Sequence, residues 1–483
     1  MCGILGISSS KNIPYKFIGS LLQLLTHRGQ DASGLAIIDK STLLPSLYKV
    51  KNQASKIEIT DTSKSKFFLG ATRYPTFGIK STVENVHNYS QPFSYKTQYG
   101  WLTLVHNGNI IKAPGIEDNE YHTDSHLITD LIGHLIDKHK GDLVKVFNEL
   151  QQEIEGSFSL VGYLKDTLFA FRDPHGIRPL SIGQNEDYVI IASESIVHQL
   201  GNILNTREVE PGELVLVPSD PILSIISHKI VDKPHRICMF EYVYFANPTS
   251  FLDGSFVYDI RLKLGRMLAS QLKEKIDSPN SKAIRFDSII PVPDTSRTAA
   301  LAISEMLNIP FREAIIKNRY LPRTFIINDE NTRRNTIDWK YSFVKKYIND
   351  QVILIVDDSI VRGNTLKALI LKLTEFKPKE IHVAITCPAI RYPCYYGIDF
   401  STEEELFASN KTEEELEYEL GIQSLTYLSI DNLHKSIPKG ICDACLSGNY
   451  PTEFATTLRN TIKLNVHSEK GKRDYERSNI KRV

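Results

Sequence analysis

The stretch that decides the fold of the second half of the chain is Val352-Ile353-Leu354-Ile355-Val356-Asp357-Asp358-Ser359-Ile360-Val361-Arg362-Gly363-Asn364-Thr365. Its first five residues are apolar and mostly β-branched, which predicts a buried strand of a parallel sheet. Two carboxylates follow at the carboxyl end of that strand, where open α/β sheets bind their ligands. Residues 366–373 have helical composition. The stretch therefore predicts a strand, a polar loop and a helix start whose backbone N–H groups cradle an anion.

The polar loop lacks the Gly-x-x-x-x-Gly-Lys pattern of a Walker-type ATP site. Two acids, a hydroxyl, an arginine and a glycine in this order resemble the phosphoribosyl pyrophosphate (PRPP) loop of type I phosphoribosyltransferases. The simpler alternative is a solvated strand end, which also favours acidic residues. The resemblance implies that the acidic pair binds the ribose hydroxyls and that the next residues wrap the 5′-phosphate. The implied PRPP-binding residues are Asp357, Asp358, Ser359, Ile360, Val361, Arg362, Gly363, Asn364 and Thr365.

Bulk composition excludes several classes of protein. A length of 483 residues predicts two or three domains. With 57 acidic and 57 basic side chains, no global field favours a nucleic acid or a membrane. No apolar run reaches the ~18 residues needed to cross a bilayer, and the N-terminus has no secretory signal. Six scattered cysteines are too few for a disulfide scaffold, so we expect a cytoplasmic protein with reduced thiols.

The N-terminus carries a candidate nucleophile. Cys2 follows Met1 directly, and its small side chain permits removal of that methionine. Removal leaves an α-amino group with a pKa of roughly 8 beside the thiol of the same residue. Nucleophile and base then lie on one residue, which suits amide hydrolysis. We expect removal of Met1 alone, without a self-cleaved propeptide.

Polar motifs downstream give this cysteine a context. In chain order they are Thr26-His27-Arg28-Gly29-Gln30-Asp31-Ala32-Ser33-Gly34, Gly70-Ala71-Thr72-Arg73-Tyr74-Pro75-Thr76, His106-Asn107-Gly108-Asn109 and Thr123-Asp124-Ser125. Each of these motifs alone consists of residues that are common in turns. Together, after an N-terminal Cys-Gly-Ile, they closely resemble the class II glutamine amidotransferases of the N-terminal nucleophile hydrolase fold. The resemblance implies an α+β domain, a four-layer αββα sandwich built on two mostly antiparallel sheets.

The same resemblance assigns roles to five residues of this half. Cys2 would be the nucleophile. Asn107 and Gly108 would form the oxyanion hole with a side-chain amide and a backbone N–H. Arg73 would clamp the α-carboxylate of glutamine. Asp124 would face its α-ammonium group.

The second half extends the phosphoribosyltransferase resemblance. We divide the chain into a glutaminase domain over 2–232, an α/β type I phosphoribosyltransferase domain with a parallel sheet over 233–460, and a basic, partly disordered tail over 461–483. Residues 288–297 predict another strand ending in an acid and hydroxyls. A long polar stretch over 317–346 is uncommon in a compact domain unless it is functional. In the family this stretch is a lid that closes over PRPP.

The two resemblances together imply one bifunctional enzyme. Glutamine would be hydrolysed through a Cys2 thioester. The ammonia would pass through an internal channel to C1 of PRPP, giving 5-phosphoribosylamine and pyrophosphate, the first committed step of de novo purine biosynthesis. Mg²⁺ would neutralise the pyrophosphate. Its implied ligands are Thr295, Asp357 and Asp358, and the implied phosphate-binding cations are Lys317, Arg319 and Arg362.

Two positions depart from the family patterns. Ala71 stands where Gly-His is common, next to the candidate glutamine-binding residues. Asp338 stands near the end of the lid, where a basic residue is common. The first departure flanks Arg73 and should leave glutamine binding intact. The second could change the contacts of the lid or the regulation by nucleotides, but not the core chemistry.

The remaining cysteines include a C-x-x-C motif, Cys442 to Cys445, typical of a Zn site, an Fe–S site or a redox pair. With Cys238 and Cys394, four thiolates could hold Zn²⁺ or a cluster, or could remain unliganded in the core. One branch of the resembling amidotransferases carries a cluster in such contexts, which implies a structural [4Fe–4S] cluster on these four cysteines. Cys387 lacks this context and is expected in the core.

Two other functions share parts of this pattern. Another amidotransferase with the same glutaminase half would need an ATP-pyrophosphate loop or a sugar-isomerase half in place of residues 352–365. A PRPP-sensing regulator would keep the transferase fold without catalysis, but the intact Cys2 motif set argues against it. The resemblance further implies a homotetramer inhibited by purine nucleotides.

Overall fold

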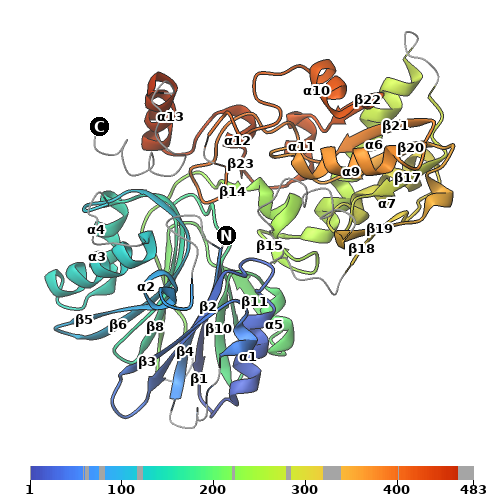
Figure 1. Ribbon diagram of the computed structural model, residues 1–483. Coiled ribbons are helices and arrows are strands. Elements are labelled where there is room, and N and C mark those ends of the chain that lie inside the picture. The colour runs from blue at the N-terminus through green and yellow to red at the C-terminus, as the bar shows by residue number, and fades with distance from the viewer. Residues whose placement is uncertain are drawn as a thin grey trace.

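The computed structural model describes residues 2–57, 59, 62, 65–74, 82–116, 123–219, 224–278, 284–318, 339–400 and 402–465. These residues form two halves, which meet where β13 (Ile226–Lys229) leads into β14 (Ile237–Cys238) (Figure 1). We call the chain up to β13 the N-terminal half and the chain from β14 onward the C-terminal half. Within the described ranges, no helix is both long and apolar enough to cross a membrane.

The N-terminal half contains two antiparallel sheets. Within the described chain, the first sheet has seven strands, in the order β11 (Asn205–Glu208), β9 (Ser181–Gln184), β10 (Tyr188–Ala192), β1 (Gly3–Ser9), β4 (Ser65–Arg73), β2 (Ala32–Asp39) and β3 (Pro45–Lys51). The six described strands of the second sheet are β13, β12 (Glu213–Pro218), β8 (Thr167–Arg172), β7 (Glu155–Leu164), β6 (Gly100–Lys112) and β5 (Phe93–Thr97). Because β1 is flanked by β10 and β4, the chain just after Cys2 is fixed on both edges.

Helices cover the outer face of each sheet. Successive side chains of β1 point to opposite faces, so Ile4 enters the core between the sheets while Leu5 and Ile7 pack toward α1 (Tyr15–Gln23). The second sheet packs its other face on α3 (Asp124–Lys138) and α4 (Leu143–Glu153). This layering confirms the predicted αββα sandwich. Short helical connections are α2 (Val86–Tyr89), α5 (Ile196–Leu200) and η1 (Ala54–Lys56).

The C-terminal half is built on a parallel sheet. Its described strands, in spatial order, are β17 (Ser288–Pro291), β20 (Val352–Asp357), β21 (Glu380–Ile385) and β22 (Ser424–Tyr427). The helices around it are α6 (Val257–Asp277), α7 (Arg297–Leu307), α9 (Asn364–Thr374), α10 (Glu413–Leu420) and α11 (Ile430–Ser436). The predicted strand β20 and the helix that follows the polar loop, α9, are both present, and the parallel sheet is confirmed.

Further elements of the C-terminal half lie outside this sheet, and α13 (Glu453–Asn465) among them lies against the N-terminal half, where Phe454 N–H donates to Glu155 (Figure 1). The others are η2 (Glu241–Phe245), β15 (Phe251–Leu252), β16 (Ser255–Phe256), β18 (Ile315–Lys317), β19 (Tyr341–Phe343), η3 (Lys345–Tyr347), β23 (Ile441–Cys442) and α12 (Ala444–Ser447). Helix α13 runs past residue 461, where the predicted tail begins. The predicted lid residues 319–338, with Arg319 and Asp338, and residues 466–483 of the tail lie outside the described residues.

One buried ion pair ties the second sheet to the C-terminal half. Arg172 on β8 is fully buried, and its two terminal nitrogens lie 3.2 and 3.0 Å from the carboxylate oxygens of Asp253. Asp253 belongs to the turn between β15 and β16. His235 Nε2 lies 3.1 Å from the same carboxylate. Burial acts to raise the pKa of Asp253, yet Arg172 and His235 hold it well below its usual range.

Replacing Asp253 tests how much the Arg172–Asp253 ion pair contributes to the free energy of unfolding. Asp253→Ala leaves the Arg172 guanidinium buried without its carboxylate, and we expect a loss of about 3–5 kcal/mol in the free energy of unfolding. Urea denaturation measures it. The control is Lys145→Ala, because Lys145 pairs with Asp142 at 3.3 Å and the two side chains are 67% and 41% exposed. That variant should lose less than about 1 kcal/mol. Equal losses would contradict a central role for the Arg172–Asp253 pair.

Candidate active site

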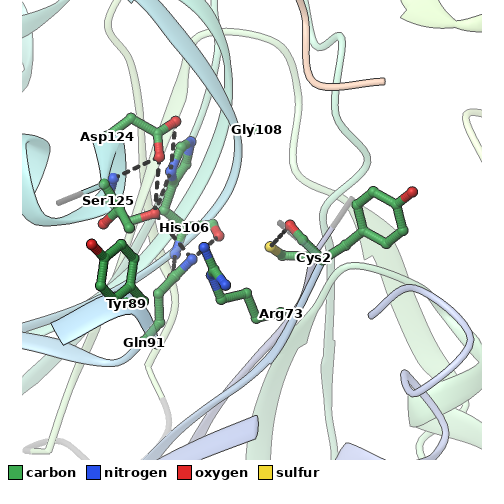
Figure 2. Close-up of a pocket in the computed structure, with 10 residues that line it drawn as sticks. Cys2, Arg73, Tyr89, Gln91, His106, Gly108, Asp124 and Ser125 are labelled. Atoms are coloured by element: carbon green, nitrogen blue, oxygen red, sulfur yellow. Dashed lines mark hydrogen bonds and ion pairs between the residues drawn. The ribbon is translucent and has the colours of Figure 1, made fainter. Parts of the chain in front are cut away.

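A pocket in the N-terminal half collects most of the predicted glutaminase residues (Figure 2). It contains about 300 Å³ of empty space that opens to solvent. Both sheets contribute, because Cys2 precedes β1 and Arg73 ends β4, while Gly108 lies on β6 of the second sheet. The lining residues are Cys2, Arg73, Tyr74, Tyr89, Gln91, His106, Gly108, Thr123, Asp124 and Ser125.

Asn107 is bonded to the candidate nucleophile. The backbone N–H of Cys2 donates to Asn107 Oδ1 at 3.1 Å. Asn107 is fully buried, and among the described residues no acceptor lies within hydrogen-bonding distance of its Nδ2. A buried amide N–H without a partner costs free energy. The arrangement therefore holds a donor ready beside Cys2.

The edge of β6 supplies a second donor. His106 N–H donates to Gln91 Oε1 at 2.5 Å, and Ile110 N–H donates to Asp124 Oδ2 at 3.2 Å. Alternate residues of a strand direct their N–H groups to the same edge. Gly108 lies between these two residues and lines the pocket, so its N–H faces the pocket.

Opposite charges flank the pocket. Arg73 is buried and pairs with Asp31 at 2.5 Å, which fixes the guanidinium at the wall. Asp124 begins α3, where the helix N-terminus favours a negative charge, and it accepts from the N–H of Ser125 at 2.8 Å. Burial lowers the pKa of His106, so this neighbouring imidazole is neutral near pH 7 and does not cancel the Asp124 charge. Figure 2 shows the Arg73 guanidinium between Cys2 and the Asp124 side.

The acidic pair of the C-terminal half lies at the carboxyl end of β20. Burial raises the pKa of Asp357 well above its usual range, and the charge of Asp358 raises it further. Burial likewise raises the pKa of Asp358 to about 6, against the opposing effects of Ser359 and Arg261. A half-buried and a buried carboxylate side by side therefore repel each other when both are ionised, and a bound cation would relieve that repulsion.

The loop closes on the start of α9. Gly363 has a φ of +75° and precedes the first residue of that helix, Asn364. A Cβ at Gly363 would also lie 2.6 Å from the ring of Phe407, so both conformation and space require glycine. The structure thus places the N-terminus of α9 directly after the acids, and a helix N-terminus is an element that can bind a phosphate group.

A second loop meets this one at the same edge of the sheet. Tyr341 on β19 lies within electrostatic reach of Asp294, Asp357 and Asp358, and burial raises its pKa. Asp294 is the neighbour of Thr295 in the loop after β17. Lys317 Nζ lies 2.8 Å from Asp294 Oδ2. The structure thus gathers the predicted PRPP-loop acids, the Thr295 loop and Lys317.

The side chain of Arg362 has protein partners of its own in this loop. The Arg362 guanidinium binds Glu405 Oε2 at 2.5 Å and the carbonyl oxygen of Asp399 at 2.5 Å, so it is engaged by these groups. Tyr341 and Arg261 were missed, because neither lies in a recognisable motif. Lys340, which the sequence placed in the lid, lies near enough to both acids to lower their pKa values.

The four predicted cluster cysteines converge. The parallel pair of β14 and β23 sets Cys238 opposite Cys442. The N–H of Tyr396 donates to Cys394 Sγ at 3.4 Å. Burial raises the pKa of Cys445, and the neighbouring thiols of Cys394, Cys387, Cys238 and Cys442 raise it further. In the described part of the chain, no three His, Cys, Asp or Glu side chains are arranged to hold a single metal ion.

Comparison with known proteins agrees with both halves. Residues 80–197 match the family described as "Glutamine amidotransferase domain", and residues 259–399 match "Phosphoribosyl transferase domain". Amidophosphoribosyltransferase from Methanocaldococcus jannaschii is 36% identical, with 94% of this chain and 98% of the relative covered. Its Bacillus subtilis counterpart is 34% identical, with 94% of each covered. The solved glutamine PRPP amidotransferase of B. subtilis, complexed with ADP and GMP, superposes with a TM-score of 0.80 at 33% identity, covering 94% of this chain and 98% of that one.

A glutamine amidotransferase half joined to a phosphoribosyltransferase half defines a class of bifunctional, glutamine-dependent transferases that use PRPP. The relatives match this chain along almost its whole length and share one activity. The chain belongs to the amidophosphoribosyltransferase family, enzymes of the first step of purine biosynthesis. The alternative pairings of the glutaminase half and the non-catalytic regulator are thereby set aside.

Gly108 offers a direct test of the pocket. A Cβ at this position would lie 1.9 Å from the carbonyl oxygen of Ser157, so Gly108→Ala must push β6 away from β7. We expect glutamine hydrolysis to fall by about 10²-fold or more, the usual cost of losing one such donor. Glutamate release measures it. The control is Gly19→Ala on α1, where the nearest atom to a new Cβ is 3.7 Å away. An unimpaired Gly108→Ala enzyme would contradict the placement of this N–H.

Proposed function

We propose that Cys2 is the nucleophile of glutamine hydrolysis in this chain. Its thiolate would attack the amide carbon of glutamine, ammonia would leave, and water would hydrolyse the thioester to glutamate. After removal of Met1, the α-amino group would serve as the base. The observation that carries this proposal is the bond from Cys2 N to Asn107 Oδ1, because it holds beside the nucleophile an amide whose Nδ2 has no partner among the described residues.

The remaining pocket residues would bind glutamine. Asn107 Nδ2 and Gly108 N–H would stabilise the oxyanion. Arg73, fixed by Asp31, would bind the α-carboxylate, and Asp124 would bind the α-ammonium. The two charges at the pocket wall match the two charges of the amino acid. Ammonia would then pass through an internal channel to the C-terminal half.

We infer that residues 357–365 bind PRPP, with Lys317 and Arg319 adding positive charge along the phosphates. Ammonia would attack C1, and the bond from C1 to the pyrophosphate oxygen would break. The engagement of Arg362 by Glu405 favours a contribution from its backbone N–H. The two domains would meet at residues 232 and 233.

Asp357, Asp358 and Thr295 would hold Mg²⁺. The buried acidic pair fits such an ion, because both carboxylates have raised pKa values without one and hard cations prefer oxygen ligands. Bound Mg²⁺ would neutralise charge on the pyrophosphate group.

Cys238, Cys394, Cys442 and Cys445 would hold a [4Fe–4S] cluster. Support comes from their convergence out of three distant segments and from the N–H donated to Cys394 Sγ, a contact that also tunes cluster thiolates. The cluster would cross-link the start and end of the C-terminal half. We further propose a cytoplasmic homotetramer that purine nucleotides inhibit, since the solved B. subtilis relative is complexed with ADP and GMP.

The glutaminase proposal predicts that the two chemistries separate in Cys2→Ala. This variant should release no glutamate from glutamine, because it lacks the nucleophile. It should still release pyrophosphate from PRPP when ammonia is supplied, because the PRPP site lies in the other half. Both products are measured in the presence of Mg²⁺. Loss of both activities in a folded variant would mean that Cys2 has a structural role instead.

The cluster proposal predicts about four irons per chain in protein purified without oxygen. Cys442→Ala should lose that iron, whereas Cys387→Ala should retain it, because Cys387 is equally buried but is not a proposed ligand. Iron and zinc are quantified by elemental analysis. One zinc and no iron would overturn the cluster assignment.

A further inference from the structure

A short segment of the C-terminal half, residues 402–407, is bound to two consecutive residues of the proposed PRPP loop. Phe407 N–H donates to the carbonyl oxygen of Val361 at 2.8 Å. Glu405 Oε2 accepts from the Nε of Arg362 at 2.7 Å and lies 2.5 Å from the Nη2 of the same residue. The segment therefore holds both the backbone of the loop and one of its side chains.

The ring of Phe407 is itself held against this loop. An added Cβ on Gly363 would lie 2.6 Å from a ring carbon, so the ring packs closely on the loop backbone. The ammonium groups of Lys367 on α9 and of Lys411 lie 5.0 and 5.2 Å from the ring centroid. Both lysines pair with Glu419 on α10. Because contacts between cations and an aromatic ring are favourable, the two lysines stabilise this position of Phe407.

The bond at Val361 determines where the next backbone N–H points. A trans peptide unit is planar, and its C=O and N–H groups point in opposite directions. Because the carbonyl of Val361 faces residues 402–407, the N–H of Arg362 in the same trans unit faces away from them. Among the described residues, no acceptor lies within hydrogen-bonding distance of the N–H groups of Arg362, Gly363 and Asn364. These donors at the start of α9 are therefore available to an anion.

Glu405 is a negative charge beside a loop proposed to bind a phosphate group. By charge alone, its carboxylate would repel that phosphate. Its other oxygen, Oε1, accepts from Thr402 N–H at 3.1 Å, so both oxygens are engaged by the protein. Arg362 Nη2 also donates to the carbonyl oxygen of Asp399 at 2.5 Å. These contacts suit a carboxylate that holds the arginine in place and does not touch the ligand.

We propose that Glu405 is a positioning residue for PRPP binding. It keeps the 402–407 segment on the loop by holding the side chain of Arg362. The segment in turn directs the Arg362 N–H, through the bond from Phe407 to the preceding carbonyl, toward the 5′-phosphate. A loop that is already ordered in this way binds its ligand at a smaller entropic cost. The inference rests on the proposed role of residues 357–365.

Glu405→Gln separates positioning from charge. Glutamine keeps an oxygen for the N–H of Thr402, but it has no charge to pair with Arg362. Removal of a negative charge alone should tighten the binding of an anion, whereas loss of positioning should weaken it. We expect the KM for PRPP in ammonia-dependent pyrophosphate release to rise about tenfold, the effect of losing one charge-assisted hydrogen bond. The value of kcat should stay unchanged, because a loss of folded protein would lower kcat and leave KM as it was.

Two further variants complete the experiment. Glu405→Asp keeps the negative charge but shortens the side chain by one methylene, so it should also raise the KM for PRPP. The matched control is Glu404→Gln, because Glu404 is exposed and the substitution removes the same charge one residue away. This control should keep the wild-type KM.

A KM for PRPP that falls or stays at the wild-type value in folded Glu405→Gln and Glu405→Asp would overturn the inference. A fall in Glu405→Gln would mean that Glu405 competes with the phosphate group for Arg362. Failure of the underlying function looks different, because the wild-type chain would then release no pyrophosphate from PRPP and ammonia. Both proposals would fall together in that case.

Discussion

The burial of Arg28 is the constraint on which the meeting of the two halves depends. An unpaired guanidinium inside a protein costs several kcal/mol, so its carboxylate partners must stay in place. One partner, Glu194, belongs to the N-terminal half, and the other, Glu241, belongs to the C-terminal half. Arg178 adds a second cation 3.6 Å from Glu241. Two cations thus face two carboxylates, and separation of the halves would leave buried charge uncompensated.

In both candidate sites the functional residues lie at the ends or edges of strands, and pairing with neighbouring strands holds these strands in place. Cys2 is held because β1 is a central strand, and the two proposed oxyanion donors lie on consecutive residues of β6. Asn107 places its side chain at the N–H of Cys2, and the next residue, Gly108, directs its own N–H to the pocket, an arrangement that an extended strand allows over two residues. In the other half, β17 and β20 are adjacent and parallel, so their carboxyl ends bring Asp294 and Asp357 to one edge. The positions of the proposed catalytic residues therefore depend on how the strands are paired, and that pairing is determined far from the reacting atoms.

Much of this arrangement could be predicted from the sequence because its signals are local. The apolar run before Asp357, the glycine at 363 and the helical sequence after it occupy one short stretch. The structure has the predicted strand, the polar loop and the helix there. The partner of Arg28 could not be predicted, because Glu241 lies 213 residues away and belongs to a π-helix without a sequence pattern. The partner of Arg362 could not be predicted for a similar reason, because Glu405, which binds its side chain, is distant in the sequence.

The segment that contains Cys394, one of the four cysteines proposed to hold a cluster, contacts the wall of the glutaminase pocket. The segment after Cys394 lies against β6, where Asn109 Nδ2 donates to the carbonyl of Tyr395 at 2.8 Å. A Cβ on Gly397 would lie 3.3 Å from the carbonyl oxygen of Gly108. The loop that contains Cys394 therefore packs directly behind a proposed oxyanion donor. If the four cysteines bind the proposed cluster, its loss would loosen this wall of the pocket, which would link the stability of the C-terminal half to the geometry of the N-terminal site.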